Sequence, residues 1–375
     1  MELSVQPYEL HVVESVLDDL RTRLRATRWP EPAPGPAWSQ GTDLGYLREL
    51  TSYWVDGFDW RTQESRLNEY DHFMADIDGV KVHFVHQRSG NPPLILTHGW
   101  PSTFAEMLPL VDRLAEHFDL VVPSLPGYTF SSRPPQVGVD RTYVARLWHR
   151  LMQGLGYERY GAHGGDFGAG VATYMALTEP SRMVGIHLST PEVSPYLGPG
   201  SAPLTPAERA YLDHLDRWDE TERGYSAIQS TRPQTLGYGL TDSPVGLAAW
   251  LVELWRAWSD SHGDVDAHIG RDALLTPITL YWVTQSITSS MRDYFDNRWH
   301  TNPIDPNDRV LTPTAMAVFA NEFVPEGEPP RELFERLYNI RRWTVFPRGG
   351  HFAAIEEPDL LASDIRAHFD DVFPA

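Results

Sequence analysis

The sequence predicts an α/β protein with a mostly parallel, doubly wound sheet, an inserted helical cap and an N-terminal wrapping extension. Three observations support this class. Short apolar runs that suit buried parallel strands alternate with amphipathic helical patterns from residue 93 onward. The alternation stops between residues 191 and 299, where helical patterns rich in aromatic residues replace it. Glycines flank Asp166 on both sides, as a tight turn from strand to helix requires.

Composition limits the classes of protein to which the chain can belong. Its 375 residues, 41% of them hydrophobic, suffice for one large core with a smaller unit inserted or appended. A formal net charge of −20 without a basic cluster argues against a nucleic-acid partner. The absence of cysteine excludes disulfides, thiolate metal sites and cysteine nucleophiles. Because no signal-peptide pattern or membrane-length apolar run occurs, we expect a soluble, cytoplasmic protein, and the arginine-rich composition suits a bacterial one.

Residues 1–85 are expected to form an extension packed on the core. Apolar residues at intervals of three or four predict two helices, separated by a proline-rich break at residues 30–36, and the positions are Val12, Val16, Leu20 and Leu24, then Leu44, Leu47, Leu50 and Trp54. The aromatic content of the second helix indicates that it packs against another part of the protein. Alternating residues around Asp78-Gly79 predict a β-hairpin over residues 72–86 with a tight primed turn.

The core is assigned to residues 86–190 and 300–375, and the helical cap to residues 191–299. The predicted core strands are residues 93–97, 119–122, 158–162, 183–188, 314–320 and 343–347. Residues 247–258 are apolar on several sides and predict a packed helix in the cap. A cap over the carboxyl edge of the sheet would roof the crevice into which Asp166 points and exclude water from it.

Asp166 is the predicted nucleophile. Residues 164–168 read Gly-Gly-Asp-Phe-Gly, a small-x-nucleophile-x-small pattern with aspartate in place of the usual serine. Such a turn holds the side chain at the carboxyl end of the sheet, near the positive end of a helix, where the carboxylate is ionised and can attack. A glycine-rich turn with a helix-capping aspartate explains the pentapeptide alone equally well. The choice between the two interpretations therefore depends on residues elsewhere in the chain.

A carboxylate nucleophile needs a group that activates water, because the ester it forms must be hydrolysed. His351 follows the last apolar strand, and Gly349 and Gly350 allow the loop that turns its imidazole toward the nucleophile. This chain order is that of the α/β-hydrolase triad. The third member should follow the penultimate strand, where Glu322 stands, and its nearest rivals, Glu326 and Glu328, lie in a loop rich in proline and glycine.

Residues 98–101, His-Gly-Trp-Pro, are expected to complete the site after the first core strand. The backbone N–H groups of Trp100 and Phe167 would form an oxyanion hole. His98 and Pro101 are expected to line the substrate pocket. The alternative is an ordinary turn that contains glycine and proline.

The chain resembles the microsomal-type epoxide hydrolase family over about residues 6–370. The matching segments are Phe58-Asp59-Trp60-Arg61 with Leu67-Asn68, His98-Gly99-Trp100-Pro101, Gly164-Gly165-Asp166, residues 242–249 (Asp-Ser-Pro-Val-Gly-Leu-Ala-Ala) and residues 349–354 (Gly-Gly-His-Phe-Ala-Ala). The resemblance implies an α/β-hydrolase fold with a cap and a triad of Asp166, His351 and Glu322. The chain departs from the family pattern at two places. Phe167 stands where the family often has tryptophan, and the interval from Glu322 to His351 is slightly longer than in the family.

The resemblance also implies two cap tyrosines, Tyr225 and Tyr294, that hydrogen-bond the epoxide oxygen. Opening an epoxide leaves a strongly basic alkoxide, and a phenol with a pKa of about 10 is a suitable acid for it. The expected reaction converts an epoxide to a vicinal diol through an alkyl ester on Asp166. The expected partners are therefore a small-molecule epoxide and water, and no metal or organic cofactor is expected, since no zinc, P-loop or dinucleotide motif occurs.

Two alternative functions are also compatible with the aspartate, the histidine and the predicted fold. A hydrolytic dehalogenase uses the same aspartate and histidine, but it needs halide-binding N–H donors in place of phenols and would release chloride from haloalkanes. A non-catalytic ligand-binding homologue would bind an epoxide or a diol without turnover. The sequence does not determine which epoxide is used, with what selectivity, or whether the role is detoxification or secondary metabolism. The aromatic content is compatible with a homodimer.

Overall fold

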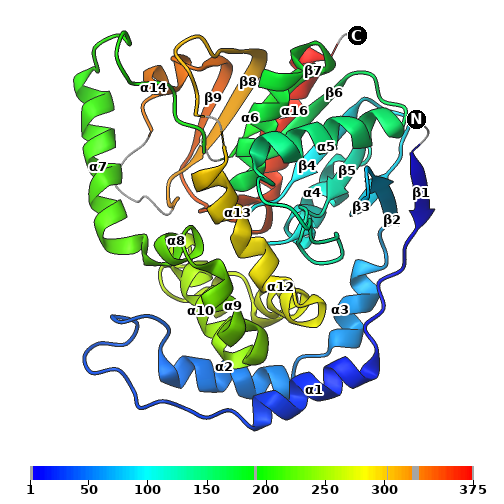
Figure 1. Cartoon of the computed structure of the whole chain (residues 1–375), viewed down its shortest axis with the longest axis vertical. Coiled ribbons are helices and arrows are strands. Elements are labelled where there is room, and N and C mark those ends of the chain that lie inside the picture. Colours follow the sequence, from blue (N-terminus) through cyan, green and yellow to red (C-terminus); the bar gives the residue numbers. More distant parts are fainter. Residues whose placement is uncertain (1–2, 190–191, 302, 323–328, 374–375) are drawn as a thin grey trace.

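A nine-stranded sheet forms the centre of the computed structural model, which describes residues 3–189, 192–301, 303–322 and 329–373 (Figure 1). The strands, in spatial order, are β1 (Ser4–Pro7), β2 (His72–Ile77), β3 (Val80–Gln87), β5 (Asp119–Pro123), β4 (Pro93–Thr97), β6 (Tyr160–Gly164), β7 (Met183–Leu188), β8 (Val310–Phe319) and β9 (Tyr338–Phe346). In this spatial order, each strand from β5 through β4 to β9 is parallel to the next one, whereas β1, β2 and β3 are antiparallel to their neighbours. The predicted mostly parallel sheet is confirmed.

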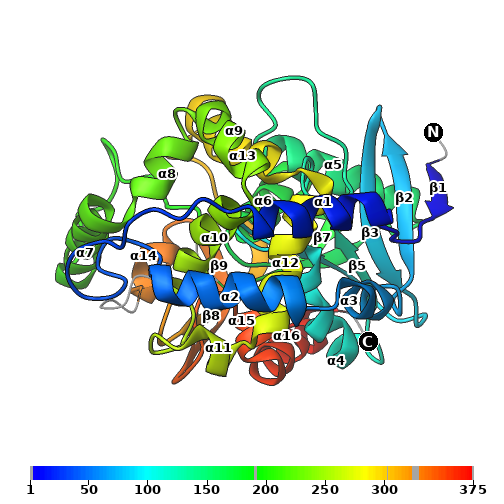
Figure 2. The same ribbon diagram turned by 90° about the horizontal axis from the view of Figure 1, so that it is seen from below.

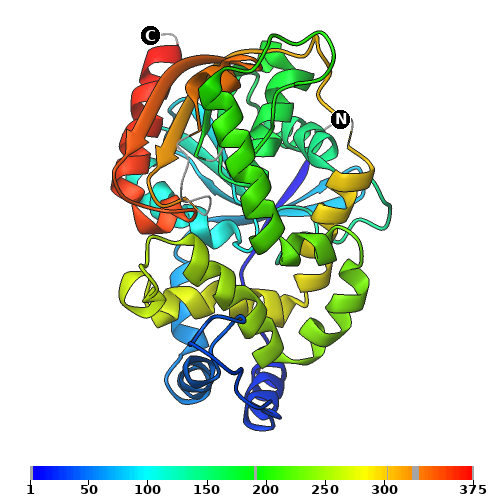
Figure 3. The same ribbon diagram turned by 90° about the vertical axis from the view of Figure 1, so that its left-hand side faces the viewer.

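Helices cover both faces of the sheet (Figure 3). One face carries α5 (Arg141–Gly154) and α6 (Phe167–Thr178), and the other carries α4 (Leu108–Leu114) and α16 (Pro358–Val372). Shorter elements of this region are η1 (Phe104–Met107), η2 (Pro180–Arg182), α14 (Arg331–Glu335) and α15 (Ala353–Glu356). Because both faces are covered, every residue of β5, β6 and β7 is buried, and this burial explains why these strands consist mostly of apolar and small residues.

The hairpin of β2 and β3 has the predicted tight turn. Ile77 pairs with Val80, so only two residues connect the strands. These residues, Asp78 and Gly79, have φ angles of 53° and 84°. Two successive positive φ angles are the signature of the primed turn that matches strand twist.

The helices between β7 and β8 in the chain are named the cap helices here; α8 to α13 lie together beside the carboxyl ends of the parallel strands, whereas α7 runs along the side of the sheet near β9 and α14 (Figure 1). They are α7 (Pro206–Glu222), α8 (Gly224–Gln229), α9 (Pro233–Asp242), α10 (Pro244–Trp258), α11 (Val265–His268), α12 (Arg271–Thr284) and α13 (Ile287–Trp299). Helix α10 buries Leu247, Leu251 and Trp255 completely, which confirms the packed helix predicted there.

The N-terminal helices α1 (Glu14–Arg25) and α2 (Leu44–Asp56) lie beneath the cap helices and run across α10 and α12, whereas α3 (Trp60–Leu67) lies beside α12 (Figure 2). Aromatic side chains of α2 make three of the polar contacts between the two layers. The hydroxyl of Tyr46 donates to Asp266 at 2.6 Å, that of Tyr53 donates to Asp272 at 2.7 Å, and the indole N–H of Trp54 donates to Thr279 at 3.0 Å. These contacts fasten the cap helices from the side opposite the sheet.

Asp166 occupies the turn between β6 and α6. Its φ of 50° and ψ of −127° are strained for a residue with a side chain. The turn is also crowded: a Cβ on Gly164 would lie 2.2 Å from the carbonyl carbon of Gly168, and one on Gly168 would lie 1.9 Å from the carbonyl oxygen of Thr97. Strand β6 begins and ends two residues later than predicted, at Tyr160–Gly164, so Gly164 belongs to the strand itself. The glycines therefore allow β4, β6 and α6 to meet at the turn.

We predict that Gly168→Ala destabilises the protein by about 1–3 kcal/mol or more, because the added Cβ must push α6 away from β4. Gly239→Ala in α9 is the matched control, since nothing lies within 4 Å of a Cβ at that position. The control should be neutral or stabilising by up to about 1 kcal/mol. Urea unfolding measures both variants, and equal stability of the two would contradict the crowding argument.

Candidate active site

The Asp166 carboxylate is held between backbone donors on one side and an imidazole on the other. Its Oδ1 accepts the N–H of Trp100 at 2.9 Å, and the neighbouring N–H of Phe167 also lowers the pKa of the carboxyl group. Its Oδ2 lies 3.6 Å from Nε2 of His351, and the side chain is 15% exposed. Burial raises the pKa of Asp166 to about 6, and the charge of His351 and the two N–H groups offset this only in part. Oδ1 thus faces the Trp100 N–H, whereas Oδ2 faces the imidazole of His351.

His351 and Glu322 form the second half of the site. His351 lies in the loop after β9, and its Nδ1 is 2.5 Å from Oε1 of Glu322. Burial lowers the pKa of His351, but the carboxylates of Glu322 and Asp166 outweigh burial and raise it to about 9. The contact at Nδ1 leaves Nε2 directed at Asp166. Glu326 and Glu328, the rival acids, lie outside the described residues.

The two expected cap tyrosines are brought to this site by α8 and α13. The ring centres of Tyr225 and Tyr294 are 5.8 Å apart. Both rings also contact the Trp100 indole, with centre-to-centre distances of 5.8 Å for Tyr225 and 5.4 Å for Tyr294. Tyr294 also meets Phe167 edge-on at 4.9 Å. Burial and the nearby charge of Asp166 raise the pKa of both phenols above the ordinary tyrosine value. Both hydroxyls therefore keep their protons and can act as donors.

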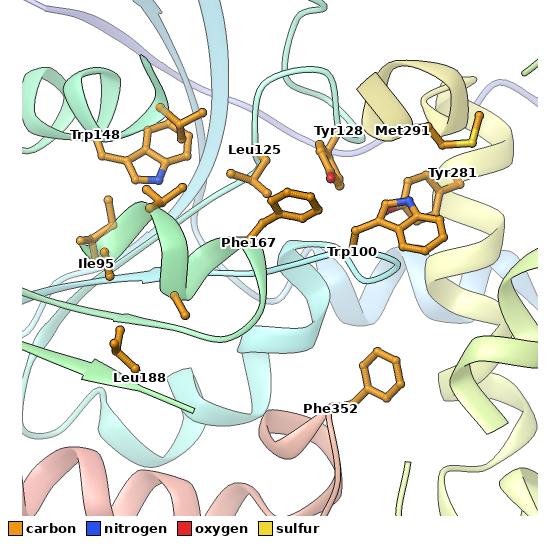
Figure 4. Packing of buried hydrophobic residues seen from close by; sticks show 14 of the residues in the cluster. Ile95, Trp100, Leu125, Tyr128, Trp148, Phe167, Leu188, Tyr281, Met291 and Phe352 are labelled. Carbon is orange, nitrogen blue, oxygen red and sulfur yellow. The ribbon is translucent and has the colours of Figure 1, made fainter. Parts of the chain in front are cut away.

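His98 and Pro101 are both buried in the loop that carries Trp100. Burial lowers the pKa of His98 to about 4, so its ring is neutral. Its Nδ1 lies 2.9 Å from the carbonyl oxygen of Gly99, and its Nε2 accepts the N–H of Leu125 at 3.1 Å. The structure thus places His98 as a link between two loops. Figure 4 shows Trp100, Phe167 and Leu125 within the packed side chains of this region.

Trp258, at the end of α10, is a site residue that the sequence analysis assigned only to helix packing. Its carbonyl oxygen accepts the N–H of His351 at 2.8 Å. Its indole ring lies 5.1 Å from the ring of His351 and 5.1 Å from that of Tyr225. Trp258 therefore joins the loop of His351 to the cap helices, a contact between residues far apart in the chain that no local pattern reveals.

An ion pair borders the site on the side of α6. Arg141 forms an ion pair with Glu192, and its guanidinium lies 5.3 Å from the centre of the Phe167 ring.

No group of three or more histidines, aspartates or glutamates in the described ranges is arranged to hold a metal ion. No helix among the described residues is both long and apolar enough to cross a membrane.

Comparisons with known proteins identify the family of this chain. Residues 5–107 match the family described as epoxide hydrolase N terminus, and residues 92–227 match the alpha/beta hydrolase fold. A putative epoxide hydrolase of Stigmatella aurantiaca is 38% identical over 97% of this chain and 84% of its own length. Epoxide hydrolase 1 of Sus scrofa is 34% identical over 97% of this chain and 88% of its own length.

Solved structures agree with this assignment. The Aspergillus niger epoxide hydrolase superposes with a TM-score of 0.85 at 29% identity, covering 99% of this chain and 97% of that one. The juvenile hormone epoxide hydrolase of Bombyx mori gives a TM-score of 0.88 at 28% identity, covering 99% and 95%. The chain therefore belongs to the microsomal-type epoxide hydrolase family, and it is an enzyme of the α/β-hydrolase fold that hydrolyses epoxides.

Proposed function

We propose that the chain opens its epoxide by forming a covalent ester on Asp166 and then hydrolyses that ester with water activated by His351. One observation carries this proposal: the two oxygens of Asp166 have different surroundings. Oδ1 accepts the N–H of Trp100, whereas Oδ2 faces the imidazole across 3.6 Å. An oxygen held by backbone donors suits the oxyanion of a tetrahedral intermediate, and the other oxygen suits nucleophilic attack.

In the first step, Oδ2 of Asp166 attacks a ring carbon of the epoxide and the ring carbon–oxygen bond breaks. Tyr225 or Tyr294 gives its proton to the departing oxygen, which becomes a hydroxyl group of a 2-hydroxyalkyl ester. The phenols are suited to this role because they retain their protons until the alkoxide, a far stronger base, develops beside them. The loss of the Asp166 charge on alkylation then eases the formation of the tyrosinate.

In the second step, Nε2 of His351 takes a proton from water, and the resulting hydroxide attacks the ester carbon of Asp166. The N–H groups of Trp100 and Phe167 stabilise the oxyanion, and Glu322 stabilises the imidazolium. Collapse of the intermediate releases the diol, which takes its proton from His351. Asp166 is left protonated, and this proton restores the phenol, so that the overall change is epoxide plus water to diol.

The substrate is expected to carry apolar substituents. The rings of Trp100, Tyr225, Trp258 and Tyr294 contact one another beside Asp166. Aromatic walls of this kind bind apolar groups and supply few polar partners. We therefore propose an alkyl- or aryl-substituted epoxide without a charged group next to the ring.

The His351→Gln variant should trap the ester, because glutamine cannot take the proton from water. After exposure to a panel of aryl and alkyl epoxides, its intact mass should increase by the mass of one epoxide. Peptide mapping should place this increase on the Asp166 peptide.

Asp166→Asn is the control for this experiment and should gain no mass. Wild-type diol release without any adduct on the His351→Gln variant would contradict the covalent mechanism. Absence of turnover by the wild type with every epoxide would contradict the substrate class.

Replacing both Tyr225 and Tyr294 with phenylalanine should slow ester formation by about 10²- to 10⁴-fold, the usual range for a positioned general acid. Each single variant should lose less, since the other phenol remains. Tyr238→Phe is the matched control because Tyr238 is 71% exposed and lies away from the contacts described above. Rapid-quench mass spectrometry measures ester formation, and an unchanged rate in the double variant would exclude the phenols as acids.

The rate of ester formation should rise with pH and level off, with an apparent midpoint near the Asp166 pKa of about 6, because only the carboxylate attacks. Ester hydrolysis should also rise with pH, since neutral His351 is the base. Its midpoint should lie below the value of about 9 for the free enzyme, because the ester no longer carries the Asp166 charge that stabilises the imidazolium. Single-turnover rates across the pH range measure both steps, and an ester-formation rate independent of pH around 6 would contradict this assignment.

A further inference from the structure

The peptide unit between Gly99 and Trp100 carries one of the two donors to Asp166. Its N–H points at Oδ1 of Asp166, so its carbonyl oxygen, which belongs to Gly99, points the opposite way. Two groups hold that carbonyl oxygen: Nδ1 of His98 at 2.9 Å and the hydroxyl of Ser102 at 3.2 Å. Hydrogen bonds at the carbonyl end fix the direction of the N–H at the other end, and they polarise it.

Ser102 is in turn held at two points. Its backbone carbonyl accepts the hydroxyl of Tyr281 from α12 at 2.7 Å. Its side-chain hydroxyl is hydrogen-bonded to Oε2 of Glu106, which lies one turn further along, in η1. Figure 4 shows Tyr281 and Trp100 within the same buried group. Glu106 is thus the last member of a chain of contacts that runs through Ser102 and Gly99 to the N–H of Trp100.

The surroundings of Glu106 make its carboxyl group easier to protonate than that of an exposed glutamate. The residue is only 8% exposed, and burial raises its pKa to about 7, although the Ser102 hydroxyl and His351 act in the opposite direction. The other charged groups that act on it are Asp166 and Glu356. A protonated Glu106 can donate to the oxygen of Ser102, which leaves the single hydroxyl proton of Ser102 for the carbonyl of Gly99.

We propose that Glu106 is a positioning residue: through Ser102 it holds the peptide of Gly99 and Trp100 so that the N–H of Trp100 stabilises the oxyanion during ester hydrolysis. This inference rests on the proposed function, because it concerns a step of the ester mechanism. It assigns a role to a buried acid that the attack on the epoxide and the activation of water do not use.

The choice of variants follows from the space around Glu106. Glu106 and Ser102 lie in the wall of a 460 Å³ cavity between α3, α4 and α12. Truncation to alanine would leave room for a water that could replace the carboxyl group. Glu106→Leu removes the hydrogen bond at similar size, and Glu106→Gln keeps a donor at the same place. Ser102→Ala breaks the same chain of contacts one step nearer to Gly99.

The test measures ester formation and ester decay separately, by rapid-quench mass spectrometry on single turnovers of one reactive epoxide. Glu106→Leu should slow ester decay by about tenfold or more, a somewhat smaller decrease than the complete loss of an oxyanion donor causes. The same variant should change the rate of ester formation by less than about threefold. Glu106→Gln should stay within about threefold of the wild type in both steps. The Glu106→Leu/Ser102→Ala double variant should be no slower than the slower single variant, because both changes break one chain of contacts.

Unchanged ester decay in Glu106→Leu and in Ser102→Ala would overturn the proposal. So would equal losses in Glu106→Leu and Glu106→Gln, additive losses in the double variant, or a parallel fall of both rates accompanied by a lower melting temperature, which indicates general destabilisation. The wild-type reaction distinguishes this proposal from the one on which it rests. A wild type that forms no ester and no diol would overturn the ester mechanism, and this inference with it.

Discussion

A buried carboxylate that accepts hydrogen bonds from backbone N–H groups is the interaction on which the site depends. Burial alone raises the pKa of Asp166, and an unpaired charge in this position would be costly. The donors from Trp100 and Phe167 and the imidazole of His351 compensate for that cost. In the proposed mechanism, the same donors are already in place when charge develops on Oδ1 in the tetrahedral intermediate. The arrangement that offsets the burial of Asp166 in the resting enzyme would then also serve the proposed hydrolytic step.

The remainder of the fold keeps two layers of this site in contact. The sheet supplies Asp166 and His351, and the cap helices supply Tyr225, Tyr294 and the Trp258 carbonyl that holds the His351 loop. The cap helices are in turn held by α2, whose side chains Tyr46, Tyr53 and Trp54 hydrogen-bond to cap residues on the side away from the sheet (Figure 2). These contacts fall on α11 and α12, whereas Tyr225 and Tyr294 lie on α8 and α13, so the N-terminal helices support the site indirectly, through neighbouring cap helices.

Local patterns made the sheet and the strand-to-helix turn predictable, because the period of the strands and the glycines around Asp166 are properties of short segments. The contact between Glu322 and His351 followed the chain order expected of the fold, and the structure brings these two residues together. The contacts of Trp258 and Glu106 could not be predicted in this way. A glutamate beside an amphipathic helix looks like a solvated residue in sequence, and only the packing of η1 under the Trp100 loop shows that it is buried.

The most direct test of the covalent account is a single turnover in water enriched in ¹⁸O, with enzyme in excess over epoxide. The ester mechanism takes the new oxygen of the diol from Asp166, and water replaces it on the carboxylate. The first diol should therefore contain no ¹⁸O, and the Asp166 peptide should gain one ¹⁸O atom. A labelled diol with an unlabelled Asp166 peptide would show that water attacks the epoxide directly, and would contradict the account.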